Sequence, residues 1–515
     1  MNNLKILDCT LRDGGYYTNW DFEKNIVREY FMAMERLPID YLEIGYRSKP
    51  LQEYLGEFFY CPKYIFEEVK RLAPSKKIAI ILNEKDCLPE DVDDLLDGFE
   101  RDIDLVRIAI DPKRFDKALL LAKEIKNKGF SVAFNVMYMS KWINDKLFLE
   151  KLDKVNGLVD FFYMVDSYGS VYPDQVRELI AIVKSKVNVP LGFHGHNNLE
   201  LAHINTLTAI ECGCQIVDAT ITGMGRGAGN LKTELLLTHF SSTKNWKFNM
   251  NDLSVTVSSF EKLQENYKWG TNLPYMFSGA NSLPQKEVME WIGLNRYPLS
   301  SIVTALENQK DEVSDNIQLP IFEENNKFTT AVIVGGGSSI INHNNAIFSF
   351  LNNLEDFCII HAGVRHTKIM SSLEKITQYY CMVGSDIHKL NKDFDDLNTI
   401  KSKCIFPPFP RKMGTIVPKE IRSNSFELKE ISFIDVFHDS PLAIAVQTAM
   451  NLSVSQIILI GFDGYKASKN NVQFQLANEN QSILDRVLTL NLSITSATKT
   501  MYKNIPERSL YSYIR

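Results

Sequence analysis

The first 225 residues alternate short apolar runs, rich in β-branched side chains, with longer amphipathic stretches. The short runs have the length of strands, and stretches such as NIVREYFMAMERL and PDQVRELIAIVKSKV repeat apolar residues at helical spacing. Eight strands, each followed by a helix, predict a closed (β/α)8 barrel rather than an open sheet. The expected strands are residues 4–9, 41–46, 77–82, 103–109, 130–137, 159–165, 189–194 and 215–222.

The chain has 515 residues, which is too many for one ordinary domain. We expect a barrel domain over residues 1–285 and a helical extension and linker over 286–325, because the polar stretches ENQKDEVSDN and EENNK mark a boundary near residue 325. The run TTAVIVGGGSSI then predicts a second, Rossmann-like α/β domain over residues 326–515.

Composition excludes several classes of protein. A net charge of −6 and a pI near 5.9 argue against a nucleic-acid-binding surface, which needs clustered basic side chains. No stretch approaches 18 uninterrupted apolar residues, so we expect no membrane span, and the N-terminus lacks the pattern of a signal peptide. The eight cysteines are scattered, which is typical of the reducing cytosol and predicts a cytoplasmic protein.

The stretch LDCTLRDGGYYTNW, residues 7–20, concentrates charge where the first strand should end. In a barrel enzyme the catalytic residues lie at the carboxyl ends of the strands. Asp8, Arg12 and Asp13 fall at that position. An exposed charged turn is the alternative interpretation of this stretch alone.

The seventh strand favours the catalytic interpretation. Its sequence GFHGHNN places His194 and His196 two residues apart, so both imidazoles point to the same side of the strand. Two histidines and one carboxylate, here Asp13, form a common site for a divalent metal. After the eighth strand, the glycine-rich loop GMGRGAGN ends in Asn230, whose amide oxygen could join the same metal.

Together, LDCTLRDG, YLEIG, FHGHNN and GMGRGAGN resemble the metal-dependent lyases and synthases related to HMG-CoA lyase, the DRE-TIM metallolyases. The four motifs occur in the order and spacing of that family, and the resemblance covers residues 1–285. The same domain occurs in 4-hydroxy-2-oxovalerate aldolases, isopropylmalate and citramalate synthases and pyruvate carboxylases. The resemblance implies a TIM barrel that performs carbon–carbon bond chemistry with a divalent metal.

The resemblance also implies roles for individual residues. Asp13, His194 and His196 would bind the metal, with Asn230 as a candidate fourth ligand, and Arg12 would face the oxygen of an enolate. Because this set contains no thiolate, Mn²⁺ or Mg²⁺ is expected rather than structural Zn²⁺.

Four further polar residues lie on or after the predicted strands. Glu43, on the second strand, would orient Arg12 through a charge-assisted hydrogen bond, as the family pattern implies. Asp166, in DSYG after the sixth strand, resembles the acid-containing loop of the family. Arg107 and Asn135 are candidates without an assigned role.

Two features bear on which member of the family this chain resembles. The segment WGTNLPYMFSG, residues 269–279, resembles the tyrosine-bearing segment that follows the barrel in 4-hydroxy-2-oxovalerate aldolases, and Tyr275 is the matching tyrosine. Those aldolases carry a histidine that shuttles a proton two residues after LRDG, where this chain has Tyr16. Whether Tyr16 transfers protons or lines the substrate pocket stays open, because a tyrosine of ordinary pKa is a poor base at neutral pH.

The sequence therefore predicts an aldolase that makes or cleaves a 4-hydroxy-2-oxo acid, from pyruvate and an aldehyde, through a metal-bound enolate. A Claisen-type synthase that joins an acyl-CoA to a 2-keto acid is the alternative. A third interpretation is a barrel that has lost activity and serves as a binding module. Barrel aldolases often pair, so a homo-oligomer is compatible with the sequence.

In the second domain, Gly335, Gly336 and Gly337 follow an expected strand, where backbone N–H groups can meet a phosphate. The turn does not match G-x-G-x-x-G, and a purely structural turn is an equal alternative. Residues 435–465 resemble the sialyltransferase-like domain of bacterial flagellin-modification proteins. That resemblance implies that this domain binds a nucleotide or nucleotide-sugar, and that the aldehyde is derived from a sugar.

Overall fold

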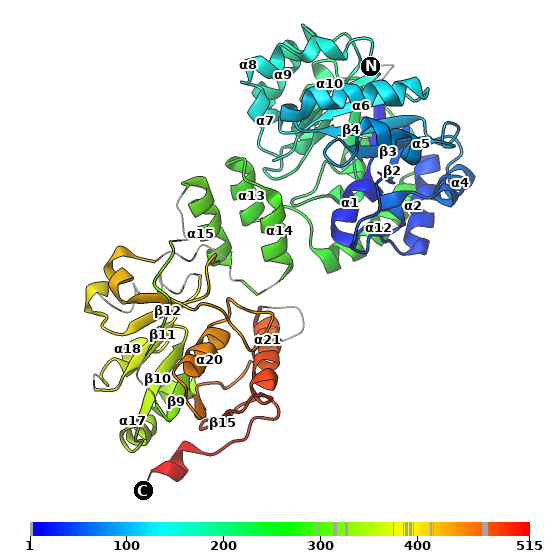
Figure 1. The fold of residues 1–515 in the computed structure, drawn as a ribbon. Helices are drawn as coiled ribbons and strands as arrows, with labels where there is room; N and C mark the ends of the chain where they lie inside the picture. The colour runs from blue at the N-terminus through cyan, green and yellow to red at the C-terminus, as the bar shows by residue number, and fades with distance from the viewer. Residues whose placement is uncertain are drawn as a thin grey trace. The chain divides into compact units, whose positions relative to one another are not determined.

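The computed structural model describes residues 4–294, 296–297, 299–312, 317–324, 328–373, 375–384, 386, 390, 394, 396–411, 415, 417–465 and 472–514. The chain divides into two compact units, residues 1–290 and 291–515, each with its own β-sheet (Figure 1). The boundary predicted near residue 325 lies outside the described residues, because 325–327 are not among them.

The first unit is a closed barrel of eight parallel strands in chain order, in which β1 pairs with β8. The predicted (β/α)8 fold is confirmed, and each observed strand end lies within three residues of its predicted position. The strands are β1 (Lys5–Asp8), β2 (Tyr41–Tyr46), β3 (Lys77–Asn83), β4 (Leu105–Ile110), β5 (Val132–Val136), β6 (Phe161–Asp166), β7 (Leu191–Gly195) and β8 (Ile216–Ala219).

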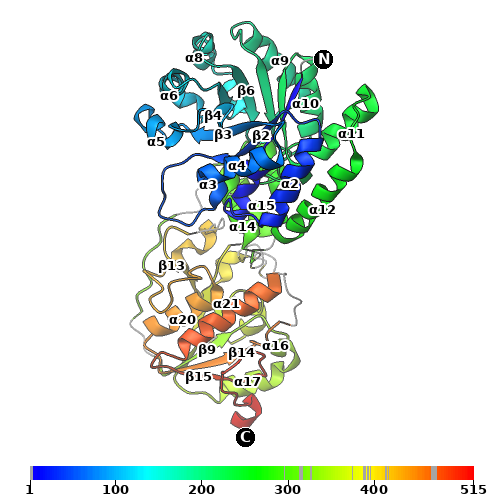
Figure 2. The ribbon, with the colours of Figure 1, turned by 90° about the vertical axis from the view of Figure 1, so that its right-hand side faces the viewer.

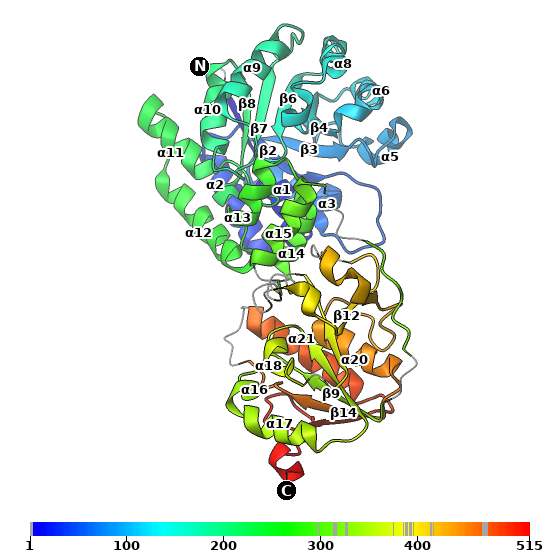
Figure 3. The ribbon, with the colours of Figure 1, turned by 90° about the vertical axis from the view of Figure 1, so that its left-hand side faces the viewer.

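Helices surround this barrel on the outside (Figures 2 and 3). They are amphipathic: in α4, for example, Ile65, Phe66 and Val69 are buried while the charged residues face solvent. The helices are α1 (Thr10–Thr18), α2 (Lys24–Arg36), α3 (Glu57–Tyr60), α4 (Lys63–Leu72), α5 (Val92–Leu96), α6 (Phe115–Asn127), α7 (Met139–Trp142), α8 (Lys146–Leu149), α9 (Pro173–Lys184), α10 (Ala202–Glu211), α11 (Thr233–Lys244), α12 (Met250–Tyr267), α13 (Leu273–Ala280) and α14 (Gln285–Gly293), the last of which spans the division between the units.

Only Cys9 separates the end of β1 from the start of α1, so Arg12 and Asp13 lie in the first turn of the helix. Its two interior glycines are explained by close packing. A Cβ at Gly14 would lie 2.5 Å from Met224 Sδ, and one at Gly15 would overlap the indole ring of Trp20. The two glycines lower the helix propensity of α1. Because they have no side chain, however, they allow the helix to lie against the mouth of the barrel.

The interior of the barrel has an apolar layer with a polar layer above it. Tyr41, Leu105, Ala133 and Ile216 belong to the apolar cluster inside the strands. Side chains on one face of a strand recur every two residues, so the next inward positions are two residues further on. These positions, near the carboxyl ends of the strands, are polar and buried: Glu43, Arg107, Asn135 and Asp218. The barrel thus brings a polar layer to the end where the functional site lies.

The second unit contains a seven-stranded parallel sheet in the order β13-β12-β11-β10-β9-β14-β15. The predicted second α/β domain is confirmed. From β9 the chain moves outward on one side to β13, and then returns to the other side of β9 for β14 and β15. The strands are β9 (Thr330–Val334), β10 (Phe357–Ala362), β11 (Gln378–Cys381), β12 (Lys403–Phe406), β13 (Ser425–Glu427), β14 (Gln456–Ile460) and β15 (Ser493–Ser496).

Helices cover both faces of this sheet, as its fully buried strands require. Ala331 and Ile333 of β9 pack in one cluster with residues of the long helices α20 and α21, and Val332 and Val334 pack in another cluster on the opposite face. The helices of the unit are α15 (Leu299–Lys310), α16 (Ser339–Asn342), α17 (Asn344–Asn352), α18 (Thr367–Met370), α20 (Pro441–Asn451) and α21 (Val472–Val487). None of the described helices in either unit is long and apolar enough to cross a membrane.

Asp8, at the end of β1, joins the barrel to two of its outer helices. Its Oδ1 accepts hydrogen bonds from the backbone and hydroxyl of Thr10 and from the hydroxyl of Tyr30 in α2. Its Oδ2 accepts a 2.7 Å bond from the hydroxyl of Thr233, the first residue of α11. Asp8 is completely buried, so these donors replace the water it loses. Asp8 therefore has a structural role rather than a catalytic one.

We expect Thr233→Val to destabilise the first unit by about 1–3 kcal/mol, because it keeps the shape of the side chain but leaves Asp8 Oδ2 without its donor. The measurement is the midpoint of urea unfolding followed by tryptophan fluorescence, since four of the five tryptophans lie in this unit. Thr243→Val, at an exposed position of the same helix, is the control and should change stability by less than about 0.5 kcal/mol. Equal midpoints for the two variants would contradict the role of Asp8.

Candidate active site

A continuous chain of buried ion pairs and hydrogen bonds crosses the mouth of the barrel. Glu43 Oε2 accepts a hydrogen bond from Arg12 Nε at 2.7 Å and lies 3.0 Å from Arg107 NH1. Arg107 NH2 pairs with Asp218 Oδ2 at 2.5 Å, and the same oxygen lies 2.8 Å from His194 Nδ1. Every member of this chain is buried. The predicted contact between Arg12 and Glu43 is therefore present, within a larger network.

The four residues expected to bind a metal lie together beside this network. Asp13 forms an ion pair with Arg12 and lies 3.5 Å from His194 Nε2, and the rings of His194 and His196 are 5.0 Å apart. Asn230 Nδ2 donates to Asp13 Oδ2 at 2.6 Å. Asn230 Oδ1 is buried and has no hydrogen-bond partner among the described residues. A buried amide oxygen without a donor fits a cation ligand.

Both histidines are held in the tautomer that a metal ligand needs. His196 Nδ1 donates to the backbone carbonyl of Asp166 at 2.8 Å, and His194 Nδ1 donates to the carboxylate of Asp218. The Nε2 atom of each ring is then free to accept. Burial, reinforced by the neighbouring His194, lowers the pKa of His196 to about 3, so this imidazole is neutral at physiological pH.

The buried charges of this layer do not balance. Burial raises the pKa of Asp13, but Arg12 and His194 outweigh burial and hold it below its ordinary value; Arg107 does the same for the pKa of Asp218. Two guanidiniums, Arg12 and Arg107, thus face three carboxylates, those of Asp13, Glu43 and Asp218. Without the imidazoles, these five side chains carry one net negative charge. A divalent cation followed by a monocarboxylate substrate would bring the total to zero, so the residues present fit a divalent metal.

By distance alone, a different group is the one set of three His, Cys, Asp or Glu side chains among the described residues that could hold a metal. Cys9, His194 and Asp218 each offer a ligand atom within 4.8 Å of the others. Burial raises the pKa of the Cys9 thiol well above its ordinary value, which keeps it protonated, and His194 Nδ1 already donates to Asp218. Thiolates and free nitrogen lone pairs are the metal-binding forms. The group around Asp13 is therefore the better cation site.

Tyr16 lies near this site but faces solvent in part. Its side chain is 37% exposed, and its hydroxyl is 3.1 Å from the hydroxyl of Tyr46. Tyr46 is buried and close enough to Arg12 to interact with it electrostatically, and burial followed by Tyr16 raises the pKa of Tyr46 well above its ordinary value. The structure thus brings Tyr16 to the edge of the site through a second tyrosine.

Tyr275 is placed differently. It lies in α13, is almost completely buried, and its ring would be 3.5 Å from a Cβ at Gly227 in the GMGRGAGN loop. Its hydroxyl interacts with Tyr17, which donates to the carbonyl of Gly227 at 2.9 Å. Among the described residues, no contact joins Tyr275 to Arg12 or Asp13. In this structure Tyr275 supports the glycine-rich loop.

Asp166 also has a local structural role. Its carboxylate accepts hydrogen bonds from the backbone N–H groups of Ser170 and Val171, and its carbonyl holds His196. Burial, partly opposed by these N–H groups, raises its pKa to about 7. Asp166 therefore shapes the loop after β6 and orients a histidine.

Analysis of the sequence missed Asp218 and Tyr46, and it left Arg107 and Asn135 without a role. The periodicity of the strands contains the signal for three of them. Arg107, Asn135 and Asp218 each stand two residues after an apolar inward residue, and Arg107 Nε donates to Asn135 Oδ1 at 3.0 Å. Tyr46 could not be found in this way, because β2 shifts register between Glu43 and Gly45 and breaks the alternation.

Comparison with known proteins shows to which family the barrel belongs. The sequence profile of the HMGL-like family matches residues 106–259. The 4-hydroxy-2-oxovalerate aldolase of Pectobacterium atrosepticum is 30% identical over 241 residues, which are 46% of this chain and 69% of that relative. This chain belongs to the HMGL-like family. The resemblance to DRE-TIM metallolyases is thereby confirmed, and the protein is an enzyme, a carbon–carbon lyase.

Two further proteins are similar to the barrel. The oxaloacetate decarboxylase of Mycobacterium tuberculosis is 27% identical over 233 residues, covering 45% of this chain and 68% of the relative. The crystal structure of the N-terminal domain of an aldolase candidate from Bacteroides vulgatus is 54% identical and matches with a TM-score of 0.56, covering 59% of this chain and all of that domain. The resemblance suggested for residues 435–465 stays a prediction.

We expect Asp218→Asn to weaken Mn²⁺ binding roughly 10- to 100-fold, because the carboxylate that fixes the His194 tautomer also neutralises Arg107. Binding is measured by calorimetric titration of Mn²⁺ into protein stripped with EDTA. Asp174→Asn, which removes a fully exposed carboxylate of α9, is the control and should bind as the unaltered protein does. Unchanged affinity in Asp218→Asn, with the fold verified by circular dichroism, would contradict the role of Asp218.

Proposed function

We propose that the first unit is a divalent-metal-dependent aldolase that cleaves or makes a 4-hydroxy-2-oxo acid, with pyruvate and an aldehyde as the smaller partners. The observation that carries this proposal is the convergence of Arg12, Asp13, His194 and His196 in one buried site. Relatives that are named 4-hydroxy-2-oxovalerate aldolase support the choice of reaction.

We assign Asp13, His194, His196 and the free Oδ1 of Asn230 to hold the metal, which is Mn²⁺ or Mg²⁺ because the set offers only nitrogen and oxygen. When bound, the metal supplies Lewis-acid stabilisation of the negative charge that develops on a keto oxygen. Arg12 adds a guanidinium that Glu43 fixes in place, so it needs no reorganisation as the charge develops.

Cleavage needs a base for the C4 hydroxyl of the substrate. Removal of that proton forms the aldehyde carbonyl while the C3–C4 bond breaks and its electron pair moves into the C2–C3 enolate. Protonation at C3 then gives pyruvate. We assign the first proton transfer to Tyr16, because the Tyr46 hydroxyl can donate to its oxygen and the Arg226 guanidinium lies 5.9 Å from its ring centre. A hydroxyl donor and a cation thus lie beside the side chain to which we assign this proton transfer.

A cavity of about 280 Å³ beside the site indicates the kind of aldehyde. The loops after β4, β5 and β6 line it, with the rings of Tyr138 and Tyr168 5.3 Å apart and Lys141 Nζ 4.8 Å from the ring centre of Tyr168. Arg226 interacts electrostatically with both Tyr138 and His196, which links the cavity to the metal site. The lining combines tyrosine hydroxyls with two lysines and two aspartates, and such polar groups suit a hydroxylated aldehyde, such as one derived from a sugar.

We expect the protein with added Mn²⁺ to exchange the methyl protons of pyruvate in D₂O, and EDTA to stop the exchange. The measurement is proton NMR of the methyl signal. Arg12→Lys should slow the exchange roughly 10²- to 10³-fold, since a lysine cannot keep both the Glu43 contact and the enolate contact. Tyr16→Phe should slow cleavage of a 4-hydroxy-2-oxo acid much more than it slows exchange.

An absence of exchange, together with an absence of pyruvate release from 4-hydroxy-2-oxo acids, would contradict the aldolase proposal. Release of free thiol from acetyl-CoA in the presence of a 2-keto acid would instead identify the Claisen-type synthase. Equal loss of exchange and cleavage in Tyr16→Phe would remove Tyr16 from its assigned role but leave the enolate chemistry.

We expect Arg226→Met to raise KM for glyceraldehyde 3-phosphate in the synthesis direction roughly tenfold, about the value of one charge-assisted hydrogen bond. The same variant should leave KM for acetaldehyde and the rate of pyruvate exchange unchanged. Lys113→Met tests one of the two lysines that line the cavity in the same assay, and Lys117→Met, at an exposed position in α6, is the control. Equal effects on both aldehydes would show that Arg226 does not select the aldehyde.

A further inference from the structure

The second unit contains its own cavity, of about 1010 Å³, at the carboxyl ends of the central strands. The loops after β9, β10 and β14 line it. The chain leaves β9 toward β10 on one side and returns to β14 on the other, so this is the point where the strand order reverses. Open parallel sheets bind their ligands in the crevice at such a point. Neither the barrel nor its proposed reaction involves this cavity.

All three glycines of the turn after β9 line the cavity, but two of them use their N–H groups within the protein. The N–H groups of Gly335 and Gly337 donate to the carbonyls of Ile460 and Gly461 at 2.8 and 2.7 Å, and a Cβ at either glycine would collide with the loop after β14. Gly336 differs, because a Cβ there would meet only Arg365, at 3.4 Å. In the described part of this unit, no acceptor is recorded for the Gly336 N–H.

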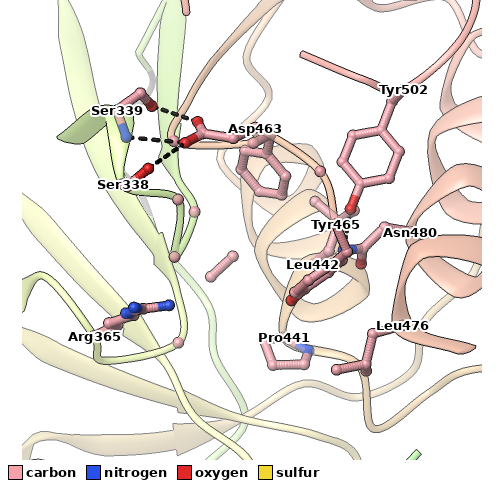
Figure 4. A pocket seen from close by; sticks show the side chains of 18 of the residues that line it. Ser338, Ser339, Arg365, Pro441, Leu442, Asp463, Tyr465, Leu476, Asn480 and Tyr502 are labelled. Carbon is pink, nitrogen blue, oxygen red and sulfur yellow. Dashed lines mark hydrogen bonds between the residues drawn. The ribbon is translucent and has the colours of Figure 1, made fainter. Parts of the chain in front are cut away.

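The start of α16 does not provide the phosphate site that the sequence suggested. Asp463 accepts hydrogen bonds from the backbone N–H of Ser339 at 2.9 Å and from the hydroxyls of Ser338 and Ser339 (Figure 4). A carboxylate therefore already occupies the position in front of this short helix. An anion in the cavity would lie instead at Gly336 and Arg365.

Two cations of the cavity have no carboxylate partner among the described residues. Each lining carboxylate already has a donor from the protein: Val383 N–H for Asp386, Ser339 N–H for Asp463 and Arg296 for Glu479. Arg365 and Lys499 are exposed, and neither forms an ion pair with a carboxylate among the described residues. They come from the loops after β10 and β15, on the two sides of the β9–β14 centre. Both side chains can therefore donate charge-assisted hydrogen bonds to an anionic group in the cavity.

The opposite side of the cavity is aromatic and aliphatic. Figure 4 shows Leu442, Leu476, Tyr465 and Tyr502 across from Arg365 and the serines. Asn480 Nδ2 donates to the Tyr502 hydroxyl at 2.9 Å, which leaves the amide oxygen of Asn480 as an acceptor next to this apolar surface. A flat ring with polar edges matches such a surface. The faces of the ring can pack on aliphatic and aromatic side chains, and an amide can form hydrogen bonds with its polar edge.

We propose that this cavity binds a nucleotide, with its phosphate at Gly336 and Arg365 and its base between Leu442, Leu476 and Tyr465. The volume far exceeds what a lone phosphate needs and is in the range of sites for ligands of nucleotide size. The separation of a cationic end from an apolar end requires one ligand with two chemically different parts. The chemistry is that of a nucleoside phosphate, whether or not a sugar extends from it.

The test is calorimetric titration of the full-length protein with CMP, UDP, ADP and NAD⁺, beside cytidine, uridine, adenosine and inorganic phosphate. We expect at least one nucleotide to bind one to one, and at least tenfold more tightly than its nucleoside or phosphate alone. Arg365→Met should weaken that nucleotide at least tenfold and leave the nucleoside unaffected. Arg422→Met, at an exposed arginine outside the cavity, should bind as the unaltered protein does.

A second variant separates the base from the phosphate. Tyr465→Ala should weaken the nucleotide and its nucleoside by the same factor, because it removes contact with the base alone. The circular dichroism spectrum and the thermal unfolding curve of each variant serve as the check that the second unit is folded. The proposal is overturned if no nucleotide binds at millimolar concentration, if inorganic phosphate binds as tightly as the nucleotides, or if Arg365→Met leaves nucleotide affinity unchanged.

Discussion

The structure of the barrel depends on one buried carboxylate that serves two buried guanidiniums. Glu43 contacts Arg12 from α1 and Arg107 from β4, and all three side chains are shielded from water. An unpaired charge in such a place would cost several kcal/mol, so each member is tolerated only in the presence of the others. A shift of β2 by one residue would turn Glu43 out of the barrel and remove the carboxylate that the two arginines share, leaving Arg12 with Asp13 and Arg107 with Asp218 alone. Strand register, the orientation of Arg12 and, through Asp218, the tautomer of His194 are therefore set together.

Much of this architecture could be predicted from the sequence, because the barrel strands are continuous apolar runs and β-branched residues mark them clearly. The residues whose spacing is fixed by a single strand or a short motif were also found: His194 and His196 lie on one strand, and Arg12 and Asp13 are adjacent. Their convergence follows from the barrel, since all strand ends meet at one mouth.

What could not be predicted depends on contacts between distant segments. Asp218 became significant only through Arg107 and His194, which lie 111 and 24 residues away in the chain. The two glycines of α1 resemble a turn in the sequence, and only the packing of Met224 and Trp20 shows why a helix keeps them. In the second unit, the glycine-rich turn left a phosphate site and a structural turn as equal interpretations, and the sequence could not show that Asp463, more than a hundred residues later, takes the N–H of Ser339.

The layering of the barrel has a consequence for how such an enzyme can diversify. The groups around Asp13 and the arginines stand largely on the strands and on α1, and the strands below them carry the apolar layer that closes the barrel. The side chains that line the smaller cavity, among them Tyr138, Lys141 and Tyr168, stand outside both layers, on the loops after the strands and on the short helix α7. Loop exchange or drift can therefore alter which molecule meets the reactive centre while the centre and the scaffold are inherited unchanged. The division gives selection, and protein engineers, two nearly independent sets of positions to vary.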